Sequence, residues 1–251
     1  MKKIGWRIYT VFTLAFVVTL IFYAPATLLA SLVESLSKGQ LLLANASGTV
    51  WKGTATPSIR QRAGKLLALE KLHWEIDALP IFSGKIISRL QWENVEQTQP
   101  MLVTASYGQL ELRNTLLPLQ AGVLGEFTPM LKPVQLSGKI NIKSELITLS
   151  TQGISGIAVA DWINAGSVLS AVNPLGSYRI NLVGAGEKLS LELTTTTGAL
   201  QLDGNGSFSP GLGLKFTVTA RAAEDSKGKI DELLNNFGPE SSPGVHTLNL
   251  M

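Results

Sequence analysis

The sequence predicts a mainly β protein, in which a single N-terminal transmembrane helix precedes a curved antiparallel β-sheet of half-barrel or groove-like form with short helices. Three observations lead to this prediction. An uncharged apolar run lies near the N-terminus, apolar residues recur at every second position over most of the remaining chain, and turn-forming clusters separate those stretches. We expect residues 1–37 to form a cytoplasmic tip and anchor helix, and residues 38–251 to form one β-rich domain.

The composition limits the class of function. Of the 251 residues, 45% are hydrophobic and only 16% are charged, against about 25% charged in an average soluble domain. The net charge of +3 arises before the apolar run: without Lys2, Lys3 and Arg7, the 21 basic residues fall to 18 and equal the 18 acidic ones. This balance argues against a nucleic-acid partner. The chain has no cysteine, which excludes disulfides and cysteine-bound zinc.

The anchor is predicted from the run between Ile8 and Val33, which contains no charged residue. About 20 apolar residues, rising about 1.5 Å each, cross a hydrocarbon core of about 30 Å. Because the basic cluster precedes the run, the N-terminus is expected in the cytoplasm and the remaining chain in the periplasm, as a single-pass protein of a bacterial inner membrane. The lipid bilayer is therefore one expected partner. The predicted anchor residues are Ile8, Phe12, Phe16, Leu20 and Phe22.

A cleaved signal peptide is the alternative interpretation of this run. Ala24-Pro25-Ala26 places small residues at the two positions that a signal peptidase inspects. The hydrophobic stretch continues from Thr27 to Val33, which favours a retained helix with Pro25 as a kink near the outer interface.

Beyond residue 38, alternating apolar residues predict strands. The runs are Leu72–Ile76, Leu110–Leu112, Ile140–Ile142, Ile180–Leu182, Leu189–Leu193, Leu200–Leu202 and Leu214–Val218. Turn clusters are expected at Ser83-Gly84, Ser137-Gly138, Gly184–Gly186, Asp203–Gly206 and Ser209–Gly211. Two hairpins follow, Tyr178–Val183 with Leu189–Thr196 and Ala199–Gly204 with Leu212–Ala220. The sheet is expected to be apolar on one face only, and its edges could pair with another protein.

Three stretches depart from this alternation. Leu116–Leu131 is apolar but contains Pro118 and Pro129, and is at best a short broken helix. Ile154–Val172 has no clean period. Lys229–Phe237 places its apolar residues on one helical face, which predicts a short amphipathic helix.

No arrangement of residues indicates catalysis. The two histidines lie in different segments, and His73 is expected to face solvent, opposite to Trp74. Ser35–Lys38 matches Ser-x-x-Lys but lacks the partner motifs of penicillin-binding enzymes. Gly184-x-Gly186 is interpreted as a hairpin turn. We therefore predict no catalytic residue, no cofactor, no metal site and no enzymatic activity.

The segment Ser47–Ala55 contains a bulky aromatic residue between glycines, on an expected early strand. Trp51 could pack in the core while Gly48 and Gly53 permit close backbone approach. It could instead form a docking site, because aromatic residues also dominate interfaces. The core interpretation is favoured over the docking interpretation.

Several short blocks run in order along nearly the whole chain. They are Gly48-Thr49-Val50-Trp51-x-Gly53, Leu72-x-Trp74 with Leu79-Pro80 and Gly84, Asn173-Pro174-Leu175-Gly176-x-Tyr178, Thr197–Leu200 continuing to Gly204-x-Gly206, and Leu233-Leu234 before Gly238. With the N-terminal anchor, these blocks resemble the type II secretion system protein N family, also called the general secretion pathway N protein family. The motif residues carried by the resemblance are structural: Gly48, Trp51, Gly53, Trp74, Pro174, Gly176, Tyr178, Gly204 and Gly206.

The resemblance implies a bitopic inner-membrane protein of a Gram-negative bacterium, with a periplasmic domain. It implies a non-enzymatic part of the machine that exports folded periplasmic proteins across the outer membrane, in contact with other inner-membrane secretion proteins. The family is also distantly similar to AsmA-like envelope proteins, whose curved sheets carry lipid. An AsmA-like lipid-binding or lipid-transfer module, with a bound lipid as its partner, is thus the alternative function.

Overall fold

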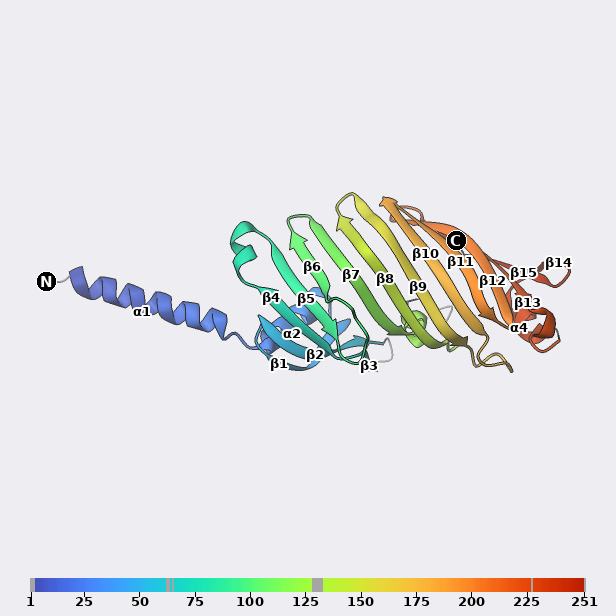
Figure 1. The fold of residues 1–251 in the computed structure, drawn as a ribbon, viewed down its shortest axis with the longest axis horizontal. Helices are drawn as coiled ribbons and strands as arrows, with labels where there is room; N and C mark the ends of the chain where they lie inside the picture. Colours follow the sequence, from blue (N-terminus) through green and yellow to red (C-terminus); the bar gives the residue numbers. More distant parts are fainter. Residues whose placement is uncertain (1–2, 62–63, 65, 128–132, 227, 251) are drawn as a thin grey trace. The chain divides into compact units, whose positions relative to one another are not determined.

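A computed structural model describes residues 3–61, 64, 66–127, 133–226 and 228–250 of the chain. The chain divides into two compact units, Met1–Glu96 and Gln97–Met251. Strands dominate both units (Figure 1), and the strand pairs within each unit are antiparallel. The prediction of mainly antiparallel β structure is therefore confirmed.

The first unit combines helices with a small sheet. Its elements are α1 (Lys3–Phe22), α2 (Ala26–Leu36), β1 (Leu41–Gly48), β2 (Lys52–Arg60), β3 (Leu66–Ala68), β4 (Leu72–Asp77), η1 (Leu79–Ser83) and β5 (Ile86–Trp92). The strands follow the order β1-β2-β4-β5, with β3 paired to β2. Ala26 of α2 is buried with Ala55 and Trp74, so α2 covers one face of this sheet.

The prediction of a transmembrane helix is wrong. Among the residues that the structure describes, no helix is long and apolar enough to cross a membrane. The apolar run Ile8–Val33 is divided between α1 and α2, because Pro25 has no N–H and disfavours a helical conformation in the residue before it. The second part of the run packs on the sheet, where Ala26 is buried. The expected single-pass topology depended on an unbroken helix.

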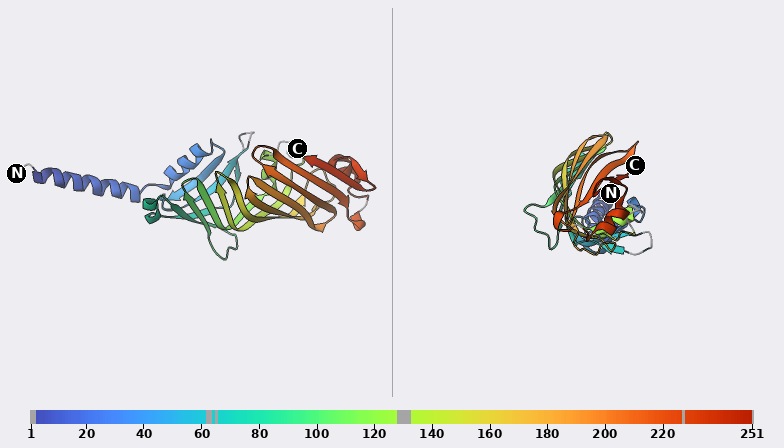
Figure 2. Two further views of the ribbon diagram at one scale, coloured as in Figure 1. Left: turned by 90° about the horizontal axis from the view of Figure 1, so that it is seen from above. Right: turned by 90° about the vertical axis from the view of Figure 1, so that its right-hand side faces the viewer.

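The second unit is a long meander. Its strands are β6 (Met101–Ser106), β7 (Gln109–Gln120), β8 (Ser137–Ser150), β9 (Gly153–Gly166), β10 (Gly176–Gly186), β11 (Lys188–Gly198), β12 (Leu200–Ser209), β13 (Gly213–Ala222), β14 (Glu240–Ser242) and β15 (Val245–Leu250). Its helices are η2 (Ala121–Val123), α3 (Leu124–Phe127), η4 (Glu224–Ser226) and α4 (Asp231–Phe237). Strands β6 to β13 are neighbours in chain order, followed by β15 and β14. Figure 2 shows β7 to β13 as a curved, open layer.

Both predicted hairpins are confirmed. Strands β10 and β11 pair from Gly176↔Gly198 to Ala185↔Lys188. Strands β12 and β13 pair from Leu200↔Ala222 to Ser209↔Gly213. Because side chains alternate across a strand, these registers place Tyr178, Leu193 and Val218 on one face. We call this the inner face.

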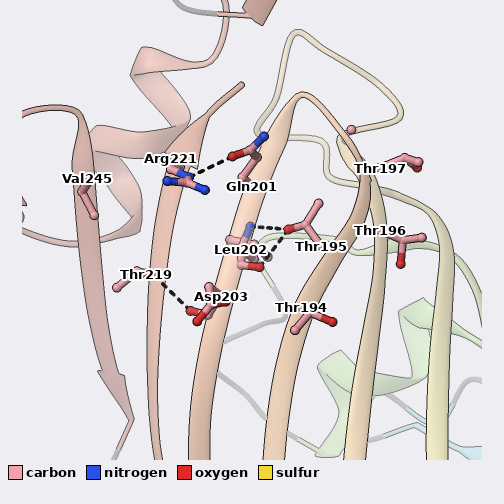
Figure 3. A pocket seen from close by; sticks show the side chains of 11 residues that line it. Thr194, Thr195, Thr196, Thr197, Gln201, Leu202, Asp203, Thr219, Arg221 and Val245 are labelled. Carbon is pink, nitrogen blue, oxygen red and sulfur yellow. Dashed lines mark hydrogen bonds between the residues drawn. The ribbon is translucent and has the colours of Figure 1, made fainter. Parts of the chain in front are cut away.

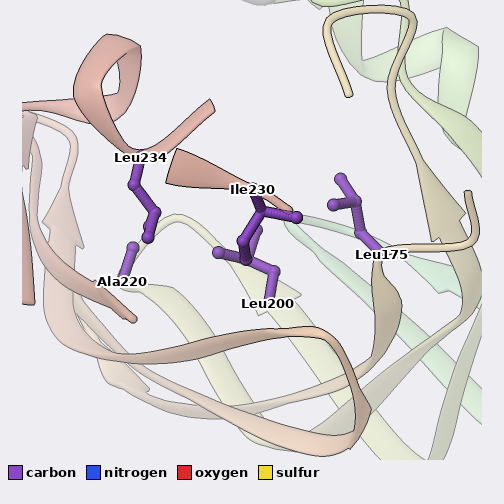
Figure 4. Packing of buried hydrophobic residues seen from close by; sticks show 5 residues of the cluster. All are labelled: Leu175, Leu200, Ala220, Ile230 and Leu234. Atoms are coloured by element: carbon purple, nitrogen blue, oxygen red, sulfur yellow. The ribbon is translucent and has the colours of Figure 1, made fainter. Parts of the chain in front are cut away.

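The core of the second unit lies where short segments cover the inner face. Leu175, Leu200, Ala220, Ile230 and Leu234 form one buried cluster (Figure 4). The predicted helix at Lys229–Phe237 is confirmed as α4, and it contributes Leu234 to this cluster, with Ile230 directly before its first residue. Ala121, Ile140 and Ala160 form a second buried cluster beside η2.

Two irregular stretches contain strands that the sequence did not reveal. Leu116–Gln120 continues β7, and Ile154–Gly166 lies within β9. The β6–β7 register ends at Leu102↔Arg113, and Pro118 lies farther along β7, opposite Asn141 of β8. Residues 128–131 of the expected broken helix lie outside the described residues.

Three of the expected turn clusters lie inside strands, and one of them, Gly184–Gly186, forms the last three residues of β10. Asp203–Gly206 belongs to β12, and Ser137-Gly138 begins β8. The Phe216 ring of β13 occupies the space that a side chain at position 206 would fill. A Cβ atom there would lie 2.6 Å from Phe216 Cδ2. The glycine is therefore covered by a cross-strand aromatic side chain and does not mark a turn.

Candidate interaction site

A tight turn joins β1 to β2 and contains the Gly48–Gly53 motif. The Thr49 amide donates to the Lys52 carbonyl at 2.9 Å, and the Lys52 amide donates to Thr49 Oγ1 at 3.1 Å. Gly48 and Gly53 are cross-strand partners. A Cβ atom on Gly53 would lie 2.5 Å from Trp74 Cζ2. Glycine at this position therefore lets the Trp74 ring lie directly against the hairpin backbone.

The turn also holds the link between the two N-terminal helices. Trp51 Nε1 donates to the Ile21 carbonyl at 2.8 Å, and its ring lies 6.2 Å from that of Phe22. The Val50 amide donates to the Ala24 carbonyl at 2.8 Å. The last carbonyls of a helix lack intrahelical partners, so these bonds stabilise the end of α1. We call the contact of Val50 and Trp51 with residues 21–24 the Trp51 junction.

Strand β4 supports the Trp51 junction from the other side. Trp74 Nε1 donates to the Val50 carbonyl at 3.0 Å, and the Ile76 amide donates to the Trp51 carbonyl at 2.6 Å. Trp74 is only 4% exposed. The turn is thus hydrogen-bonded both to the end of α1 and to β4, and the two tryptophans of the sequence motif lie in one contact network.

The predicted anchor residues all lie on α1 and are exposed. They are Ile8, Phe12, Phe16, Leu20 and Phe22, together with the aromatic residues Trp6 and Tyr9 on the same helix. Exposed apolar surface of this extent marks a contact with a protein or a membrane. The Trp51 junction attaches this exposed apolar helix to the sheet.

The second group of motif residues supports the inner face of the second unit. The Asn173–Pro174 peptide bond is cis and is separated from β10 by one residue, Leu175. Gly176 faces Gly198 across the β10–β11 ladder, and a Cβ atom on Gly176 would lie 2.5 Å from the Thr197 carbonyl oxygen. Tyr178 is 2% exposed, and its hydroxyl donates to the Leu200 carbonyl at 3.0 Å. Gly204, opposite Leu193 on the inner face, is buried.

Burial raises the pKa of Tyr178 well above its usual value near 10. Tyr178→Phe should remove the bond to Leu200 and cost about 1–3 kcal/mol of stability at neutral pH. The unfolded chain loses this phenolic proton at lower pH than the folded chain does. The stabilisation from Tyr178 is thus complete below about pH 10 and is lost as the pH rises further.

The difference in unfolding free energy between wild type and Tyr178→Phe should therefore shrink above about pH 10. Urea unfolding at neutral and at strongly alkaline pH measures it. A constant difference across this range would show that the Tyr178 phenol is not buried as described.

A polar hollow of about 570 Å³ lies where β11 and β12 separate (Figure 3). Thr195 Oγ1 bridges the two strands, donating to the Leu202 carbonyl at 2.8 Å and accepting from its amide at 2.6 Å. Arg221 Nε donates to Gln201 Oε1 at 2.8 Å. The polar groups named here already have partners within the hollow. We therefore attribute the hollow to the end of the β11–β12 ladder, where the two strands diverge, and not to a binding site.

The two histidines and the Ser-x-x-Lys motif do not form a common site. The His73 side chain is 44% exposed, and its Nε2 lies 4.0 Å from Glu93 Oε1. His246 is buried, with Nδ1 2.9 Å from the Gly238 carbonyl oxygen. Ser35 and Lys38 flank the end of α2 and are exposed. Within the described ranges, no group of three or more histidine, aspartate or glutamate residues could hold a metal ion.

The structure therefore defines a class of protein, a β scaffold to which an exposed apolar helix is attached. The family model for the type II secretion system (T2SS), protein N, matches residues 39–249, and the chain belongs to this family. The Type II secretion system protein N of Pectobacterium carotovorum subsp. carotovorum is 25% identical over 245 residues, which cover 94% of this chain and 92% of that protein. No solved structure matches the chain. The chain is thus a component of the type II secretion system, and this family is associated with the inner membrane.

Proposed function

We propose that this chain is a non-enzymatic component of the type II secretion system that supports export of folded periplasmic proteins across the outer membrane. It acts through contacts between its β-rich part, residues 38–251, and other inner-membrane secretion proteins in the periplasm. The observation that carries this proposal is the attachment of the exposed apolar helix α1 to a β scaffold by the Trp51 junction. This arrangement keeps the scaffold beside the surface that α1 binds.

The surface that α1 binds is the lipid of the inner membrane. Removing a large apolar side chain from water contributes about 1.5–3 kcal/mol, and the predicted anchor residues alone supply five such side chains. A single exposed ion pair contributes about 0–1 kcal/mol. Apolar burial therefore dominates the binding free energy of this helix.

The contact with other secretion proteins is assigned to the free edge of β1. In the described part of the chain, β1 pairs with β2 on one side and ends the strand order on the other. Ser37 Oγ accepts from the Leu41 amide at 3.0 Å at the start of this edge, and Pro25 bridges to Thr49 just past its end, so the edge open to a partner is the middle of β1. A strand with an unpaired edge can add a strand from another protein.

Cysteine crosslinking tests this contact, because the chain has no cysteine of its own. Ser47→Cys places a thiol on an exposed position of β1, and Ser190→Cys places one on an exposed position of β11, which has a neighbour on both sides. In cells with an intact secretion machine, Ser47→Cys should give adducts with another secretion component and Ser190→Cys should not. Equal adducts from both positions, or undiminished secretion after deletion of the gene, would contradict the proposal.

A second candidate function is lipid binding on the inner face. Phe208 and Leu214 are opposite each other on this face near the β12–β13 turn and are 37% and 40% exposed, whereas Leu200 and Ala220 at the other end are covered by α4. An apolar face left open in this way fits an acyl chain. Native mass spectrometry of the purified chain distinguishes the candidates, since a mass free of lipid would remove this one.

A further inference from the structure

A second exposed apolar element lies in the first unit, at the tip of the β4–β5 hairpin. The tip comprises residues 78–86 and contains the short helix η1. Phe82 is 90% exposed and Leu79 is 82% exposed, and Ile81 and Ile86 are exposed beside them. Aromatic and aliphatic side chains displayed together on a turn of this size mark a contact surface.

Several backbone groups of this tip are paired with one another. The Gly84 amide donates to the Ile81 carbonyl at 3.0 Å, and the Lys85 amide donates to the Pro80 carbonyl at 3.1 Å. Ser83 Oγ also donates to the Pro80 carbonyl, at 2.7 Å. Gly84 closes the turn at φ +75°, a left-handed conformation that suits glycine. Because these polar groups are paired internally, they add little to the cost of moving the tip into the interfacial region of a bilayer.

The charge of the tip is positive. Residues 78–86 contain Lys85 and no acidic residue. The nearest carboxylate along the chain, Asp77, is neutralised by Arg89, whose Nη2 and Nη1 lie 2.6 Å and 3.0 Å from its two oxygens. Apolar side chains beside a free basic group fit a bilayer with anionic headgroups.

The Trp51 junction places this tip at the same end of the unit as the C-terminal end of α1. Trp51 contacts Ile21 through its indole and Ile76 through its carbonyl. Ile76 lies three residues before Leu79, where η1 begins. A membrane surface that contacts α1 along its length, up to Phe22, therefore also lies next to the η1 tip.

We propose that the η1 tip is a second membrane contact, which inserts Leu79, Ile81 and Phe82 into the interfacial region of the bilayer that α1 binds. This inference rests on the proposed binding of α1 to lipid. Two contacts at one end of the unit fix the orientation of the sheet relative to the membrane, whereas α1 alone would leave the sheet free to rotate. The free edge of β1 is then presented to its protein partner in one orientation.

Single-cysteine labelling of the full chain with an environment-sensitive fluorophore tests the proposal. The probe positions are Phe82→Cys on the tip, Phe16→Cys on α1 and Glu70→Cys as a control at an exposed site before β4. Six residues of β4 rise about 20 Å, so the control lies at the far end of the strand from the tip. Vesicles of phosphatidylethanolamine and phosphatidylglycerol carry a nitroxide-labelled lipid as quencher. Leu79→Cys serves as a second tip probe if labelled Phe82→Cys does not fold.

The proposal predicts a blue shift and quenching at positions 16 and 82, with neither at position 70. Quenching at position 16 without quenching at 82 would overturn the tip contact and leave membrane binding by α1 in place. Such a result would also follow if the tip docked on a protein, which the vesicles lack. No quenching at position 16 would overturn the proposed binding of α1 itself. Equal quenching at positions 70 and 82 would show non-specific adsorption and contradict an oriented tip.

Discussion

Trp74→Asp should unfold the first unit at temperatures where the wild type is stable. Trp74 is 4% exposed and packs with Ala26 and Ala55, and loss of a buried tryptophan side chain costs about 3–5 kcal/mol. The substitution adds a buried carboxylate without a partner, which raises the cost further. It also removes the indole donor to the Val50 carbonyl. Thermal unfolding followed by circular dichroism measures the effect.

His73→Asp is the matched control, because it places the same side chain at the adjacent position on the opposite face of β4. The His73 side chain is 44% exposed, and substitutions at exposed positions usually change stability by less than about 0.5 kcal/mol. Proximity to Glu93 adds a small repulsion between like charges. If both aspartate variants lost the same stability, the inferred facing of β4 would be incorrect.

Ile230→Ala should destabilise the second unit by about 2–5 kcal/mol, the range for truncating a buried isoleucine. Ile230 is 1% exposed and lies at the start of α4, within the cluster that joins this helix to the inner face (Figure 4). Loss of its side chain leaves a cavity between α4 and the strands, so α4 should detach before the sheet unfolds. Urea unfolding gives the free energy, and hydrogen exchange of the α4 amides reports the detachment.

Lys229→Ala provides the comparison for this prediction. Lys229 is the adjacent residue and is exposed, with its Nζ 3.5 Å from the Asp225 carbonyl oxygen. This variant should unfold within about 0.5 kcal/mol of the wild type. A similar loss in both variants would mean that the segment before α4, and not the buried cluster, determines stability there.

The strands that sequence could predict are those with bulky apolar residues at alternate positions. Strand β9 was missed because its inner positions are occupied by small residues, including Gly156, Ala158 and Ala160. These face Gly184, Leu182 and Ile180 of β10, so the bulk that fills the inner face comes from the neighbouring strand. A pattern read along one strand does not contain that information.

The end of the apolar N-terminal run was misjudged for a related reason. The residues on the two sides of Pro25 are similarly hydrophobic, so composition does not separate them. Those before it nevertheless form an exposed helix, and those after it pack on the sheet. The two helices are separated where residues 24 and 25 pair with the β1–β2 turn. Pro25 forms a bridge with Thr49, and the Val50 amide donates to the Ala24 carbonyl. Every residue has a backbone carbonyl, so the sequence does not indicate which carbonyls accept these hydrogen bonds.

The importance of the Gly48–Gly53 motif could be predicted, but its contacts could not. Aromatic residues between glycines indicate close packing, whereas the acceptor of the Trp51 indole lies 30 residues earlier in the chain. The η1 tip shows the same limit. Leu79, Ile81 and Phe82 look like core residues in the sequence, and only the structure shows that they are exposed.

Flotation of the full chain with lipid vesicles tests the central claim, that α1 binds the β scaffold to a membrane surface. The comparison is between the wild type and a variant carrying Phe12→Ser, Phe16→Ser and Leu20→Ser, all at exposed positions of α1. Circular dichroism should show that both retain the same β structure. The wild type should rise with the vesicles, and the triple variant should remain at the bottom of the gradient. A wild type that stays at the bottom, or a triple variant that floats equally well, would contradict the central claim.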